Sequence, residues 1–188
     1  MEKYLILVKH SLPEVIEGVP AREWRLSEEG HNRAERLAEQ LMQYRPEVIV
    51  SSVERKAQQT AEIVAKNHNL TFSIVDGLHE HDRSNVPHLS QEQFRTSVRA
   101  FFQKPDKLVF GKETADQAYA RFYRALHSIL NEHERKTIVV VSHGTVISLF
   151  VSRLTGSSDF DLWSMLGLPS FIAIDLHLDT LIVRDHIV

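Results

Sequence analysis

Cysteine is absent from the 188-residue sequence, which excludes disulfide bonds, thiol nucleophiles and zinc sites built on cysteine. Glycine and proline are scarce, at 7 and 6 residues, so we expect few flexible linkers or low-complexity loops. Long apolar runs are also missing. The run at residues 4–8 is too short for a signal-peptide core or for the roughly 18 apolar residues of a membrane span. These absences predict a cytoplasmic protein without a membrane partner.

A large net charge is missing too. The chain has 22 Lys and Arg residues against 25 Asp and Glu residues, which gives a formal charge of −3. A nucleic-acid-binding protein would carry a strong positive excess, so we expect no nucleic-acid partner. A small cationic pocket is still compatible with this balance. The 11 histidines are counted as neutral, and with an ordinary pKa of about 6.5 they make the charge sensitive to pH near neutrality.

Short apolar segments alternate with amphipathic segments along the chain. The predicted strands cover residues 4–8, 48–50, 72–75, 137–141, 171–176 and 181–183. Helices are predicted over 28–43, after Ser51-Ser52, after the capping-box patterns that start at Ser90 and Thr114, and over 146–154. This alternation predicts an α/β fold, a three-layer α/β/α sandwich with a mostly parallel central sheet. We expect a single domain over residues 1–188, in which residues 76–113 form a loop-and-helix insertion over the active site.

Two histidines directly follow predicted strands, at the edge where such sheets bind ligands. His10 follows the first strand and His143 follows the fourth, and each is succeeded by a small residue. Either histidine alone would be explained by a hydrogen bond to the backbone. Their equivalent positions favour a shared crevice.

The same strand ends carry features suited to an anion. Ser51-Ser52 and Gly144-Thr145 each stand between a strand and a helix, where free N–H groups and the helix dipole attract negative charge. Ordinary helix capping by the hydroxyl groups is a compatible alternative. Lys9 and Lys56 add positive charge nearby, so we expect a local cationic pocket.

Five short motifs follow one another between residues 5 and 147. They are Leu7-Val8-Lys9-His10-Ser11, Leu26-Ser27-Glu28-Glu29-Gly30, Ser51-Ser52-Val53-Glu54-Arg55-Lys56-Ala57-Gln58-Gln59-Thr60-Ala61, Leu78-His79-Glu80 and Ser142-His143-Gly144. In this order and spacing they resemble the motifs of the histidine phosphatase superfamily, also called the phosphoglycerate mutase-like family.

The resemblance implies a role for each matching residue. His10 would be the nucleophile that accepts the phosphoryl group, and His143 would bind that group and stabilise its charge. Glu80 would protonate the leaving oxygen and then activate water. The implied function is metal-independent hydrolysis of a small phosphorylated molecule through a phosphohistidine, without a cofactor. Because Glu80 must hold a proton near neutral pH, we expect its pKa to be raised.

Three positions depart from the family pattern. Lys9 and Lys56 replace two arginines of the phosphate pocket, and Ser11 replaces a glycine. Lysine offers a point charge where arginine offers a planar fork, so the pocket geometry is expected to be looser. Ser11 and Gly144 remain candidate phosphate contacts. The departures keep two alternatives open: a non-catalytic member that binds a phosphorylated or other anionic ligand, and a phosphomutase.

The segment His79-Glu80-His81-Asp82, with His88 beyond it, allows a different interpretation. Histidine and carboxylate side chains are metal ligands, but a solvated, histidine-rich loop is the simpler prediction, and we expect no metal. Arg83, His81 and Trp24 are candidate substrate contacts. The natural substrate and the oligomeric state do not follow from the sequence.

Overall fold

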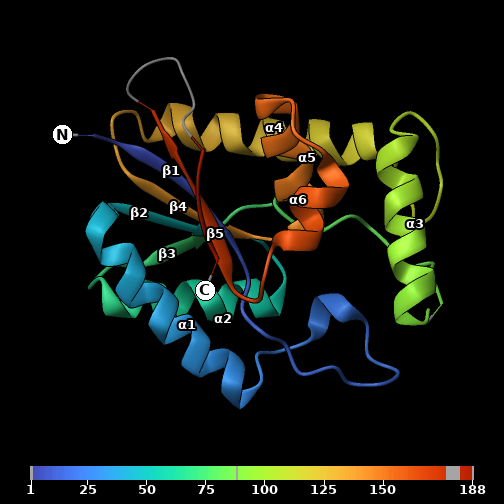
Figure 1. Ribbon diagram of the computed structural model, residues 1–188. Coiled ribbons are helices and arrows are strands. Elements are labelled where there is room, and N and C mark those ends of the chain that lie inside the picture. The colour runs from blue at the N-terminus through green and yellow to red at the C-terminus, as the bar shows by residue number, and fades with distance from the viewer. Residues whose placement is uncertain (1, 88, 177–182, 188) are drawn as a thin grey trace.

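The structure is a computed structural model that describes residues 2–87, 89–176 and 183–187. Its elements, shown in Figure 1, are β1 (Tyr4–Lys9), η1 (Ala21–Glu23), α1 (Glu28–Leu41), η2 (Met42–Tyr44), β2 (Val48–Ser51), α2 (Arg55–Asn67), β3 (Phe72–Ile74), α3 (Gln91–Gln103), α4 (Ala115–Glu132), β4 (Ile138–Ser142), α5 (Gly144–Thr155), α6 (Asp159–Met165), β5 (Ser170–Asp175) and β6 (Val183–Ile187).

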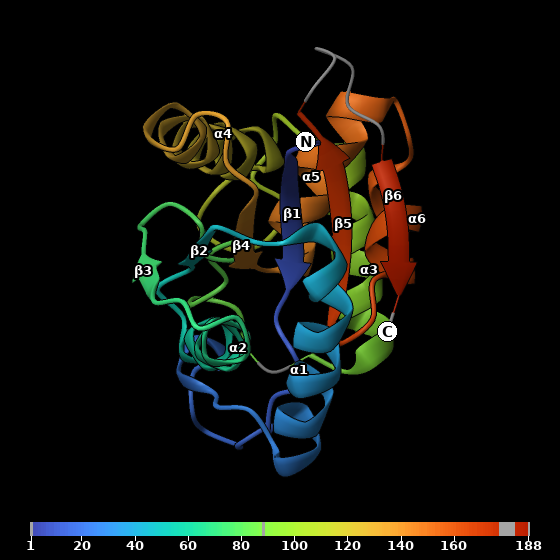
Figure 2. The same ribbon diagram turned by 90° about the vertical axis from the view of Figure 1, so that its left-hand side faces the viewer.

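The strands form one six-stranded sheet in the order β3-β2-β4-β1-β5-β6. Neighbouring strands from β3 to β1 are parallel, whereas β5 is antiparallel to β1 and β6 is antiparallel to β5. Figure 2 shows the opposed arrows of β1, β5 and β6 side by side. The prediction of a mostly parallel sheet is confirmed.

The sheet is covered on both faces, which explains why its central strands are apolar throughout. Along β1, Leu5 and Leu7 pack on one side with α3, α4, α5 and α6. Ile6 and Val8 point to the other side, where they meet α1 and α2. Figure 1 shows α1 and α2 below the sheet and α4, α5 and α6 above it. These layers are those of the predicted α/β/α sandwich.

The carboxyl ends of β1, β2 and β4 lie at one edge of the sheet. In the pairing register, Lys9 is opposite Ser142 and Ser51 is opposite Val141. The loops that leave these ends therefore start close together, although they are far apart in sequence. This edge is where the candidate site is assembled.

Several local predictions can be compared with the structure. The capping boxes at Ser90 and Thr114 are confirmed, because each hydroxyl accepts from the backbone N–H three residues later and each glutamine side chain accepts in return. The helix α6 was not predicted. The last strand, expected over 181–183, is found at Val183–Ile187, and residues 181–182 lie outside the described residues. Within the described ranges, no helix combines the length and apolar character needed to cross a membrane.

Candidate active site

His10 directly follows β1 and is buried, with 8% of its surface exposed. Its Nδ1 atom lies 2.8 Å from the carbonyl oxygen of Ser11. A carbonyl oxygen can only accept, so Nδ1 carries the hydrogen and the neutral ring keeps its lone pair on Nε2. Burial, followed by the nearby His143 and Lys56, holds the pKa of His10 well below its ordinary value. The ring is therefore neutral at pH 7, as a nucleophile must be.

His143 precedes α5 as its N-cap residue and is fully buried. Its ring centroid lies 5.2 Å from that of His10, with the planes at 61°. The Nε2 atom is 2.8 Å from the Ser52 hydroxyl oxygen, and burial together with the charge of Lys56 holds the pKa of His143 well below its ordinary value. The structure thus brings together the two histidines that follow the strands. Ser52 is not the N-cap of α2, as the alternative required, because that helix begins at Arg55.

Glu80 lies in the loop after β3 and reaches the start of α5. One carboxylate oxygen accepts from the backbone N–H of Thr145 (3.2 Å) and the other from that of His81 (2.8 Å). Burial alone would raise the pKa of Glu80, but Arg83, His143 and the His81 N–H outweigh burial and lower it. The expectation of a raised pKa is wrong for the ligand-free protein, because these partners all stabilise the carboxylate.

Lys56 has a partner that the sequence did not reveal. Its Nζ atom lies 2.6 Å from a carboxylate oxygen of Glu54 and 2.7 Å from the carbonyl oxygen of Ala21. The Lys56 and Glu54 side chains are 7% and 9% exposed. The other Glu54 oxygen accepts from the backbone N–H of Glu80 at 2.9 Å. The sequence offered one signal for this ion pair. Glu54 is an acidic residue two positions before Lys56, at a position where the family motif allows any residue.

The side chain of Lys9 lies beside the first turn of α5. Its Nζ atom donates to the carbonyl oxygen of Leu166 at 2.8 Å, and burial lowers its pKa to about 8, although Glu80 acts in the opposite direction. A Cβ atom on Gly144 would lie 3.2 Å from the Lys9 Cε atom. The glycine therefore leaves room for the lysine side chain beside the first turn of α5.

The Ser11 hydroxyl is used inside the loop that follows β1. It donates to the carbonyl oxygen of Gly30 at 2.7 Å, and the Ser11 backbone N–H donates to the Thr60 hydroxyl at 3.0 Å. Ser11 is completely buried. With its proton committed to Gly30, this hydroxyl has no proton left for a phosphate oxygen in the observed arrangement.

The structure does not bring His81 to the pocket. Its ring stacks on Phe101 at a centroid distance of 4.1 Å, meets Phe110 edge-on, and is 2% exposed. Its Nε2 atom lies 3.2 Å from the carbonyl oxygen of Glu113. The expectation of a solvated loop is therefore wrong for His81, because a neutral imidazole can pack against aromatic rings and still satisfy one nitrogen.

The other two candidate substrate contacts lie in different surroundings. The Arg83 guanidinium lies 4.8 Å over the Phe94 ring, close enough to Glu80 to lower its pKa. The Trp24 indole N–H donates to the carbonyl oxygen of Val19 at 2.9 Å, within the loop between β1 and α1. Arg83 is thus the candidate with an electrostatic link to the site.

The histidine-rich segment does not form a metal centre among the residues that the structure describes. No group of three or more His, Asp and Glu side chains there could hold an ion. His79 faces Asp76 instead, with 3.4 Å between Nδ1 and the carboxylate oxygen. His88 lies outside the described residues.

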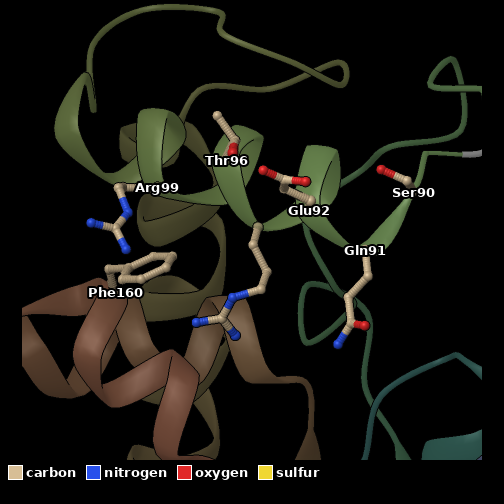
Figure 3. A pocket seen from close by; sticks show the side chains of 7 residues that line it. Ser90, Gln91, Glu92, Thr96, Arg99 and Phe160 are labelled. Carbon is tan, nitrogen blue, oxygen red and sulfur yellow. The ribbon is translucent and has the colours of Figure 1, made fainter.

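A groove of about 570 Å³ lies between α3 and α6. Figure 3 shows Arg99 next to Phe160, whose ring centroid lies 4.1 Å from the guanidinium carbon, with Ser90 and Gln91 at the start of α3. None of the predicted site residues lines this groove. The candidate site is therefore a set of buried groups at the sheet edge.

Together these groups are the parts that phosphoryl transfer requires. A neutral imidazole with a free Nε2 can attack phosphorus. A second imidazole, two ammonium groups and the N-terminus of α5 can position and stabilise a phosphoryl group. The fold and site thus define an α/β enzyme of the phosphoryl-transfer class.

A sequence profile described as the histidine phosphatase superfamily (branch 1) matches residues 6–180. The chain belongs to this superfamily, and the predicted resemblance to histidine phosphatases is confirmed.

Named relatives are phosphatases. The chain is 28% identical to phosphoserine phosphatase 1 of Hydrogenobacter thermophilus over 144 residues, which cover 74% of this chain and 68% of that protein. It is 30% identical to the metal-independent phosphoserine phosphatase of Arabidopsis thaliana over 141 residues, which cover 71% of this chain and 59% of the relative. The match thus leaves 32% of the first relative's length and 41% of the second's unaligned.

Solved structures share the whole architecture. The phosphoserine phosphatase of Entamoeba histolytica, crystallised with 3-phosphoglyceric acid, superposes with a TM-score of 0.79 at 20% identity, covering 99% of this chain and 98% of that one. A mycobacterial glucosyl-3-phosphoglycerate phosphatase gives a TM-score of 0.77 at 19% identity, covering 100% and 98%. These similarities confirm the fold.

Proposed function

We propose that this chain is a metal-independent phosphatase that hydrolyses a small phosphomonoester through a phosphohistidine on His10. The observation that carries the proposal is the contact between His10 Nδ1 and the Ser11 carbonyl oxygen. It fixes the tautomer, so the lone pair on Nε2 is available for attack.

In the first step, Nε2 of His10 forms a bond to phosphorus and the bond to the ester oxygen breaks. Glu80 delivers a proton to that oxygen, and the alcohol leaves. In the second step, water attacks phosphorus while Glu80 takes a proton from it, and the N–P bond breaks. Phosphate is released and His10 returns to its neutral form, so the cycle balances without a metal or cofactor.

The remaining groups hold the phosphoryl oxygens. His143, Lys9 and Lys56 supply the stabilising donors, and the start of α5 at Gly144 adds backbone N–H groups. We assign Arg83 a contact with the rest of the substrate, and we place residues 76–113 over the site. Because the named relatives act on phosphoserine or are described with phosphoglycerate compounds, such small phosphorylated acids are the first substrates to test.

The ion pair between Lys56 and Glu54 supports a second candidate function, a non-catalytic protein that binds an anionic ligand. A lysine already paired to a carboxylate is less free to stabilise a transition state than an unpaired arginine. A phosphomutase remains a third candidate. The cytoplasmic location remains a prediction.

The test compares the purified protein with the His10→Ala variant on p-nitrophenyl phosphate in the presence of EDTA. We expect the variant to lose about 10³-fold or more in kcat, because covalent catalysis is removed. Quenching with alkaline detergent, after mixing with a phosphomonoester radiolabelled in its phosphoryl group, should trap alkali-stable, acid-labile label in the parent protein alone.

The matched control is His127→Ala, which removes an exposed histidine of α4 and should leave the rate unchanged. Equal rates for the parent and His10→Ala would contradict the His10 mechanism. Absence of turnover in both, with retained phosphate binding, would favour the anion-binding candidate.

A further inference from the structure

Around His10 and His143 the carboxylates equal the ammonium groups in number, and the guanidinium of Arg83, over the Phe94 ring, is a further cation that acts on Glu80 and His143. Lys9 and Lys56 supply the ammonium groups, whereas Glu54 and Glu80 supply the carboxylates. The pKa of each carboxyl is lowered from its ordinary value despite burial, by Lys56 for Glu54 and by Arg83 for Glu80. Both are therefore ionised at neutral pH, while the two imidazoles are neutral. The cationic pocket expected from the sequence is compensated in the structure, and the compensating group is Glu54.

Glu54 touches three parts of the site at once. One of its oxygens lies 2.6 Å from Lys56 Nζ. The other lies 2.9 Å from the backbone nitrogen of Glu80 and 3.5 Å from His143 Nε2. Only 8% of the Glu54 surface is exposed, so water screens these interactions weakly. A phosphate oxygen that approaches Lys56 must therefore share its ammonium group with a buried carboxylate.

We infer that Glu54 is a positioning and specificity-determining residue: it holds Lys56 in place, neutralises the pocket, and so admits the phosphoryl group as a protonated monoanion instead of a dianion. The inference rests on the proposed function, because it assumes that the phosphoryl group binds between His10 and Lys56. A dianion would meet two carboxylates that offset the two ammonium groups, and the approach of like charges opposes binding.

A protonated phosphoryl group also supplies the proton that Glu80 must deliver. This carboxylate is ionised in the ligand-free protein, yet the proposed first step needs it to deliver a proton. A phosphomonoester monoanion brings that proton with it. The proton moves from the phosphoryl oxygen to Glu80 and from Glu80 to the leaving oxygen, while the P–O ester bond breaks and the bond from His10 forms.

Few protein groups around Glu54 interfere with a measurement of this proton. The groups that face it are Lys56 on α2, Glu80 in the loop after β3, His10 after β1 and His143 before α5. Between about pH 6.5 and 7.5 the two carboxyls stay ionised and the two imidazoles stay neutral, because the pKa values of the carboxyls are lowered from 4.5 and those of the imidazoles are held well below 6.5. Lys9, farther from Glu54, has a pKa of about 8. A pH dependence in that range then reports mainly the ionisation of phosphate.

The experiment measures inorganic phosphate binding by isothermal titration calorimetry across this range, in two buffers with different ionisation enthalpies. For the parent protein we expect weaker binding as the pH rises, with a proton uptake that grows with pH as the dianion becomes the main form of phosphate in solution. Glu54→Gln keeps an oxygen that can accept from Glu80 but removes the charge. It should bind phosphate about tenfold more tightly at the upper end, and its proton uptake should disappear.

Two further variants test whether the negative charge of Glu54 or the shape of its side chain controls phosphate binding. Glu54→Asp keeps the negative charge and should retain the proton uptake of the parent. Glu62→Gln makes the same charge change at an exposed position of α2 and should behave as the parent does. Thermal melting of each variant checks that it is folded.

The inference is overturned if the parent takes up no proton, if Glu54→Gln binds phosphate no more tightly, or if Glu54→Asp and Glu54→Gln change binding in the same way. It is also overturned if neither the parent nor Glu54→Gln binds phosphate. None of these measurements needs turnover. A protein that binds as expected but keeps its hydrolytic rate in the His10→Ala variant would refute the proposed function and leave the role of Glu54 intact.

Discussion

Lys9 gives the site an upper pH limit at the scale of a single residue. Its pKa of about 8 means that the side chain loses its positive charge as the pH rises through that value. Loss of a charge that stabilises phosphate lowers kcat/KM, by up to about tenfold per pH unit above the pKa. We therefore expect a break near pH 8 in the profile of kcat/KM for p-nitrophenyl phosphate, in addition to any fall caused by ionisation of the substrate.

The matched variant is Lys9→Arg, which has the residue found in the family pattern. Arginine stays protonated throughout this range, so its profile should lack the break near pH 8. A break that persists in Lys9→Arg would mean that another group is responsible.

Individual residues also show how far sequence reasoning reached. His10 and His143 could be located because each follows an apolar strand, and strand direction determines where such side chains gather. Glu54 could not be recognised as a site residue from the sequence. A carboxylate in a turn belongs to no periodic pattern, and the sequence does not show that it pairs with a buried lysine. Ser11 was correctly placed beside His10, but its hydroxyl partner Gly30 belongs to another segment, which sequence alone does not bring close.

Residues 76–113 are the segment that we propose lies over the site. It is tied to the rest of the fold by Arg121 of α4, which donates to the carbonyl oxygens of Gly77 and His79 at 2.8 and 2.9 Å. Within the segment, His81 packs on Phe101 and Phe110. Its anchoring is thus aromatic as well as polar.

This packing predicts what replacement of His81 does. The His81→Ala variant loses a buried ring and leaves a cavity next to Phe101, so we expect a loss of about 2–4 kcal/mol in the free energy of unfolding. The KM for p-nitrophenyl phosphate should stay within about twofold of the parent value, since the side chain faces the core. Urea denaturation and steady-state kinetics measure the two quantities.

His79→Ala is the matched control in the same segment, because His79 is only partly buried and lacks the ring stack. It should lose less stability than His81→Ala. A large rise in KM for His81→Ala without loss of stability would instead favour the substrate contact that the sequence suggested.

Helices and strands with a clear hydrophobic period or a capping motif could be predicted from the sequence, whereas α6 could not. This helix has only seven residues, from Asp159 to Met165, and none is buried. A helix of this length shows too little of a 3.6-residue period to be recognised. It forms because Ser158 caps it and because it packs against α5 and α3, and the second cause depends on the tertiary fold.

At the scale of the whole molecule, the fold keeps His10 and His143 neutral by burying them, and this has a cost in stability at acidic pH. The pKa values of His10 and His143 are held well below 6.5 in the folded protein. In the unfolded chain both return to about 6.5. Below that pH the unfolded chain therefore binds more protons than the folded protein, so stability falls as the pH falls.

Each such histidine lowers the free energy of unfolding by about 1.4 kcal/mol per pH unit below its unfolded pKa, so the pair contributes up to about 3 kcal/mol per pH unit. The carboxyls of Glu54 and Glu80 add to this loss only below their ordinary pKa of 4.5. Urea denaturation between about pH 5 and 7 should therefore show a steep slope, from which His10→Asn or His143→Asn each removes up to about 1.4 kcal/mol per pH unit. His68 and His81 also have lowered pKa values, so part of the slope remains when either residue is replaced. An unchanged slope in both variants would show that burial of His10 and His143 does not control acid stability. A slope reduced by the expected amount would tie the neutrality of these two imidazoles directly to the stability of the fold.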